Sequence, residues 1–158
     1  MAITSFHQLC ADLCEVCGVP APELAPDESG LLGMTLTLHE VDVCLHHAPL
    51  AATPAVHVSV EFGVVPAAVE LQALRELLDT NLMLHGVNAP AFARNPTSGD
   101  VLLQYAVSLD RATVAGLFES INALVLMAQQ WREDYFLSSE DAQPDATSPA
   151  ASVHGAYA

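Results

Sequence analysis

Apolar residues in the first 17 positions recur at helical spacing. Between residues 3 and 17 they form one stripe, and Thr4 or Ser5 stands where a helix cap is expected. The stripe consists of Ile3, Phe6, Leu9, Cys10, Leu13, Val16 and Cys17. Gly18 can end this helix, and three prolines between residues 20 and 26 predict an irregular linker.

From Leu32 onward the hydrophobic period changes to two, which is typical of β-strands with one buried face. Residues 32–38, 41–46 and 56–62 each alternate apolar and polar side chains. Short antiparallel sheets commonly pack one face on a core and leave the other face in water. These three segments therefore predict antiparallel strands with one solvent-exposed face.

The helical period returns after Pro66, where an apolar face runs from Val69 to Met83 and ends near Gly86. The residues that follow predict a hairpin, because strand-like segments at Pro90–Arg94 and Val101–Leu109 flank a turn of Asn, Pro, Thr, Ser and Gly.

Asp110 stands where the N-cap of a last helix is expected, and apolar residues at helical spacing continue from Val114 to Tyr135. Together the elements predict an α+β protein with one domain over residues 1–137 in the order α-β-β-β-α-β-β-α, an antiparallel sheet with helices packed against it. Residues 138–158 are small, polar, acidic and proline-containing, so we expect an acidic tail without fixed structure.

The charged residues of the chain exclude or disfavour several classes of function. The chain has 19 acidic residues, four arginines, no lysine and a formal net charge of −15. Without lysine it cannot form a Walker-type phosphate loop or a Schiff base, and its charge disfavours nucleic acid and anionic membranes as partners. It would attract positively charged polypeptides. No apolar run is long enough to span a bilayer and no secretory signal is recognisable, so we expect a cytoplasmic protein.

Four cysteines raise the question of metal or redox chemistry. Cys10, Cys14 and Cys17 have a spacing that could hold an iron–sulfur cluster, but they lie among leucine and valine on the stripe of the first helix. Buried free cysteine behaves as a small hydrophobic residue. We therefore expect reduced thiols, including Cys44, with Cys14 at the edge of the stripe as the most exposed.

The histidines at positions 39, 46, 47 and 57 lie on neighbouring predicted strands and could hold zinc if their geometry converged. Alternation places His39 and His57 on the polar face, where solvent exposure also explains them. No nucleophile–base constellation is recognisable. We expect no enzymatic activity, no cofactor and no metal.

The second helix carries more apolar residues than one core-facing stripe needs. Leu71, Leu78, Leu82, Met83 and Leu84 spread around it. A wide apolar face on a small domain often marks a subunit interface. The strand at 32–38, if it lies at a sheet edge, could also accept an extended partner segment by strand addition.

Three segments of the second half are informative. They read LRELLDTNLMLHG (74–86), FARNPTSGDVLLQYAVSLD (92–110) and LFESINALVLMAQQWRED (117–134). They resemble, in turn, three features of the class I type III secretion chaperones, the CesT or Tir-chaperone family: a helix with a leucine pair followed by Asn-Leu, a strand–turn–strand with a Val-Leu-Gln run, and a closing helix with a Trp-Arg pair.

The resemblance implies a cytoplasmic bacterial homodimer that binds the N-terminal region of a secreted effector and keeps it secretion-competent without hydrolysing ATP. Carried over by position, it places the dimer contact at Leu78, Leu82, Met83 and Phe92. It places the effector-binding groove at Phe6, Leu9, Leu13, Met34, Leu36 and Leu38. Core packing remains an alternative for each of these residues, and a regulatory adaptor that binds a folded partner remains an alternative function.

Overall fold

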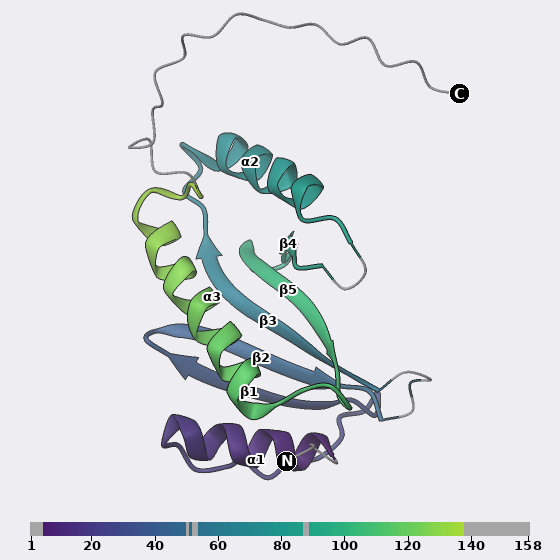
Figure 1. The fold of residues 1–158 in the computed structure, drawn as a ribbon. Helices are drawn as coiled ribbons and strands as arrows, with labels where there is room; N and C mark the ends of the chain where they lie inside the picture. The colour runs from purple at the N-terminus through teal and green to yellow at the C-terminus, as the bar shows by residue number, and fades with distance from the viewer. Residues whose placement is uncertain (1–4, 50, 52–53, 87–88, 138–158) are drawn as a thin grey trace, which may run out of the picture.

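The computed structural model describes residues 5–49, 51, 54–86 and 89–137. They form a five-stranded antiparallel sheet with two helices over one face and a third helix beside its edge strand (Figure 1). The elements are α1 (Phe6–Cys17), β1 (Leu32–Leu38), β2 (Val41–His47), β3 (Ala55–Val64), α2 (Glu70–Met83), β4 (Ala91–Arg94), β5 (Asp100–Ser108) and α3 (Val114–Asp134). The strand order is β1-β2-β3-β5-β4. The predicted fold class and element order are confirmed, whereas the proposed tail at 138–158 lies outside the described residues.

The sheet keeps the predicted alternation. Val43 pairs with Val60, and Val58 pairs with Tyr105, so the apolar residues of neighbouring strands share one face. His39 is not on a strand: together with Glu40 it forms the tight turn between β1 and β2, with φ of 50° and 63°. Two-residue hairpin turns need positive φ at both positions, which is why the strand stops at Leu38.

Helix α1 begins at the predicted cap and covers β1 and β2. The Ser5 hydroxyl accepts a hydrogen bond from the Gln8 N–H at 3.2 Å, and Gly18 ends the helix in the left-handed conformation at φ 69°. The Phe6 ring stacks on His47 of β2 with ring centroids 5.3 Å apart. Phe6, Leu9, Cys10 and Leu13 of the apolar stripe are therefore buried in the core, whereas Val16 near the end of the helix is 53% exposed.

Helix α3 begins three residues later than the sequence predicts. Asp110 belongs to the turn after β5, where it accepts a hydrogen bond from the Ser108 hydroxyl, and the N–H groups of Arg111 and Ala112 bond to the Ser108 carbonyl. Thr113 is the cap, and its hydroxyl accepts from the Gly116 N–H at 3.2 Å. A short turn thus separates the strand from the helix.

The C-terminal turn of α3 fixes the helix across the sheet. Trp131 is 1% exposed and packs edge-on against Phe62 of β3 with ring centroids 5.6 Å apart. The next residue, Arg132, donates hydrogen bonds to the carbonyls of Phe62 (2.8 Å), Glu40 (2.9 Å) and Glu61 (3.0 Å). The first and last of these carbonyls lie where the β3–β5 register shifts, so Arg132 binds backbone at an irregularity of the ladder.

Helix α2 lies beside β4 at the end of the sheet rather than over its centre (Figure 1). Only Ala73 and Leu77 of this helix are buried. Asn81 ties it to β4, because its amide donates to the Phe92 carbonyl at 3.0 Å and its oxygen accepts from the Phe92 N–H at 2.7 Å. The helix is therefore held by few contacts and presents most of its surface outward.

The cysteines are free, and their exposure differs from the prediction. Cys14, expected to be the most exposed, is 1% exposed, and its thiol lies 3.5 Å from the Met34 sulfur. Cys17 and Cys44 are partly exposed. Burial raises the pKa of Cys10 to about 12, with the nearby Cys14 adding to the shift, and burial also raises the pKa of Cys14. The helix rotation that buries Cys10 also turns Cys14 inward.

We expect Arg132→Ala to lower the free energy of unfolding by about 2–4 kcal/mol, because three carbonyls lose a charged donor. Urea denaturation followed by far-UV circular dichroism measures this change. The matched control is Arg111→Ala, which removes an arginine from the exposed turn before α3. Equal stability of the two variants would show that the Arg132 hydrogen bonds contribute little.

Cys10 and Cys14 should be nearly inert to Ellman's reagent in the native protein at pH 8, because each is only 1% exposed and burial raises the pKa of both thiols. For Cys10, a pKa of about 12 leaves only about one thiol in ten thousand ionised. A Cys17→Ser/Cys44→Ser double variant isolates these two thiols. It should react only after unfolding in denaturant, and rapid labelling of the folded variant would contradict the burial of Cys10 and Cys14.

Candidate functional site

The outward side of α2 is an apolar strip. Leu71, Leu78 and Leu82 are 65%, 66% and 72% exposed, and Met83 is 80% exposed. The three leucines follow one another at i, i+7 and i+11, which places them on one side of the helix. Leaving several large apolar side chains in water is unfavourable, so this strip is a candidate contact surface.

Two apolar hollows lie near the same helix, and Phe92 lines both of them. A hollow of about 500 Å³ is lined by Leu84, Phe92, Leu126 and Met127, among others. A second hollow, of about 220 Å³, is lined by Leu74, Leu78, Phe92 and neighbouring residues. Helix α2 therefore does not pack tightly against the sheet, and the two apolar hollows near it remain unfilled.

The predicted dimer residues divide into two groups. Leu78, Leu82 and Met83 are on the exposed strip, whereas Phe92 is 8% exposed and lines both hollows. Their role in a dimer remains a prediction. The sequence interpretation did not single out Leu126 and Met127 of α3, which are 53% and 42% exposed. The uninterrupted apolar run Leu124–Met127 was the available signal, since one helical face cannot bury all four residues.

The predicted effector-binding residues lie mostly inside the protein. Leu38 is partly buried. The other five are no more than 6% exposed: Phe6, Leu9, Leu13, Met34 and Leu36. Their side chains fill the space between α1 and the sheet, which favours the core-packing alternative for them. Direct contact with a client would require α1 to leave the sheet, and their role in binding remains a prediction.

The two edges of the sheet differ in how they are covered. At β4, Asn81 satisfies both backbone groups of Phe92. At β1, the described residues provide no hydrogen bond to the side of the strand that faces away from β2. Unpaired strand edges are ready templates for an added strand. The predicted edge at Leu32–Leu38 is therefore present and open.

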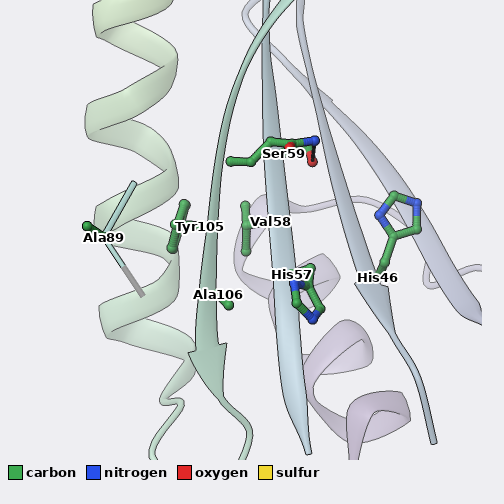
Figure 2. Close-up of a pocket in the computed structure, with 8 residues that line it drawn as sticks. His46, His57, Val58, Ser59, Ala89, Tyr105 and Ala106 are labelled. Carbon is green, nitrogen blue, oxygen red and sulfur yellow. Dashed lines mark hydrogen bonds between the residues drawn. The ribbon is translucent and has the colours of Figure 1, made fainter. Parts of the chain in front are cut away.

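The sheet face opposite the helices is polar and shallow. A hollow of about 370 Å³ on it is lined by His46, His57, Ser59 and Gln104, among others (Figure 2). At the other end of this face, burial raises the pKa of Glu61, and the carboxylates of Asp100 and Asp42 raise it further. Among the described residues, no group of three or more histidine, cysteine or acidic side chains could hold a metal ion.

No helix in the described part of the chain is both long and apolar enough to cross a membrane. The arrangement offers what a polypeptide ligand uses: an open strand edge, exposed apolar side chains and unfilled apolar hollows.

Comparison with solved structures supports this reading of the fold. A chain in the crystal structure of the ExsC–ExsE complex is 25% identical, with a TM-score of 0.61, over 88% of this chain and 100% of that chain. A chain in the HopA1–SchA chaperone–effector complex is 17% identical, with a TM-score of 0.54, over 79% of this chain and 91% of that chain. None of the curated proteins compared with the chain matches it significantly.

The profile of the Tir chaperone protein (CesT) family matches residues 8–132. The match spans the region from α1 to the Trp131–Arg132 pair, and thus contains the strands and helices described above. The chain belongs to the Tir chaperone protein (CesT) family.

Proposed function

We propose that this protein is a cytoplasmic chaperone that binds the N-terminal region of a type III secreted effector and keeps that region extended and secretion-competent. Membership of the CesT family is the observation that carries the proposal. The ExsC–ExsE complex and the HopA1–SchA chaperone–effector complex, which contain chains of similar fold, add support.

The proposed activity is binding without catalysis. The chain has no lysine with which to hold nucleotide phosphates in a Walker-type loop. Client release would then depend on the export machinery rather than on ATP hydrolysis by this protein.

We place the self-association surface on α2. The strip of Leu71, Leu78, Leu82 and Met83 faces outward, and the apolar hollows beside Phe92 lie next to it. In a two-fold dimer the same patch is used on both subunits. Contact between the two copies of the strip would therefore bury apolar surface on both subunits. Exposed apolar area of this kind is what an obligate dimer interface contains.

We place the client along β1. Its open edge offers N–H and C=O groups to an extended segment, as in other complexes formed by strand addition. The exposed positions of β1 carry the small residues Gly33, Thr35 and Thr37, which do not hinder close approach. The net charge of −15 would attract a client segment that carries basic residues.

Leu78→Arg and Leu82→Arg should each convert a dimer into a monomer, because a guanidinium would have to be buried without a partner at the interface. Light scattering after gel filtration should give twice the chain mass of 16.7 kDa for the wild type and a single chain mass for both variants. Val16→Arg is the matched control, since Val16 is 53% exposed on α1 and should remain dimeric. A monomeric wild type at micromolar concentration would refute the proposed interface.

Client binding should slow backbone amide exchange in β1. The experiment compares hydrogen–deuterium exchange of the free protein with that of its complex with an effector co-purified from a secreting cell. Protection should include residues 32–38, because the outer N–H groups of the edge strand gain acceptors.

Limited proteolysis of the same complex separates the chaperone from the adaptor hypothesis. A client held in extended form should be cleaved throughout the parts that the chaperone does not cover, whereas a partner that docks as a folded domain should resist cleavage.

In the hydrogen–deuterium exchange experiment, unchanged amide exchange in β1 on client binding would argue against strand addition.

A further inference from the structure

His46 and His57 are neighbours on the uncovered side of the sheet. They are partners in the β2–β3 register, and both side chains are exposed. Directly opposed residues in antiparallel strands have Cβ atoms about 4.5–5.5 Å apart, a separation that two imidazoles can bridge through one metal ion. Figure 2 shows the two side chains on neighbouring strands at the hollow that both line, with their rings apart.

The ring nitrogens of both histidines lack hydrogen-bond partners among the described residues, unlike those of His47 and His85, which pair with backbone carbonyls. The His46 ring lies over Gly33 of β1, where a Cβ would meet the His46 ring carbon at 3.1 Å. Because Gly33 has no side chain, the His46 ring has room above it, and no polar contact holds the ring in place. Rotation about the His46 side-chain bonds can therefore turn the ring toward His57.

The surroundings are compatible with a cation. The hollow between the two histidines also contains Ser59 and Gln104, which bond to each other at 3.2 Å, and no lysine or arginine lines it. The net charge of −15 raises the local concentration of cations near the surface. Neutral imidazole is a preferred ligand of zinc, nickel, copper and cobalt.

We propose that His46 and His57 together bind one divalent transition-metal ion on the outer face of the sheet, with water completing the coordination. The site includes no residue of α2 and is therefore separate from the proposed dimer surface. It borders the proposed client surface, because the His46 ring lies over Gly33 of β1. Because it supplies only two protein ligands, it holds the ion more weakly than a closed four-ligand zinc site. The ion would link β2 to β3 across the solvent-exposed face.

Cobalt(II) added to the untagged full-length protein tests the proposal, with binding measured by isothermal titration calorimetry and by the visible spectrum. The wild type should bind about one ion per chain. His46→Gln and His57→Gln should each weaken binding at least about tenfold, because each leaves a single imidazole. His7→Gln is the matched control: it removes an exposed histidine from α1 and should leave the affinity unchanged.

Two outcomes would overturn the assignment. One is equal affinity of the wild type and the His46→Gln/His57→Gln double variant, which would place the ion elsewhere. The other is a thiolate-to-cobalt charge-transfer band that disappears in Cys44→Ser, which would make the neighbouring thiol the principal ligand. All three substitutions are on the solvent-facing side of strands, and unchanged circular dichroism would show that the variants remain folded.

Discussion

The packing of α3 across the sheet is the constraint on which the other elements depend. Trp131 fills the space beside Phe62, and Arg132 donates to three carbonyls that belong to β3 and to the β1–β2 turn. A single helical turn thus joins segments some 70 to 90 residues apart in the chain. Buried backbone carbonyls need partners, and a guanidinium has enough donors to serve three of them at once.

With α1 and α3 filling one face, the remaining surfaces are left for partners. Helix α2 buries only Ala73 and Leu77 and exposes its leucine strip. Strand β1 keeps an open edge, whereas Asn81 covers part of β4. The residues that stabilise the fold are therefore different from those available for binding. The core does not need the outer side of α2, so that side is available for association. The opposite face of the sheet adds the histidine pair, whose chemistry differs from that of the apolar surfaces.

Hydrophobic periodicity predicted the fold well because each element alternates at the spacing of its own geometry. It was less successful at helix starts: Asp110 and Thr113 are both good caps, and only the turn after β5 selects Thr113. It also could not decide which apolar residues remain exposed. Leu82 and Leu77 are equally apolar in the sequence, yet one is 72% exposed and the other 3%.

The sequence by itself determined the element order, the antiparallel sheet, the acidic charge that disfavours nucleic acid and the family resemblance, since these depend on local spacing and composition. Only the tertiary structure decided that Phe6, Leu9 and Leu13 are core residues, that Cys14 is buried and that the leucine strip of α2 faces water. The physical reason is that exposure depends on which other element covers a face. For α1 that element is the sheet, and for the outer side of α2 the described chain supplies none.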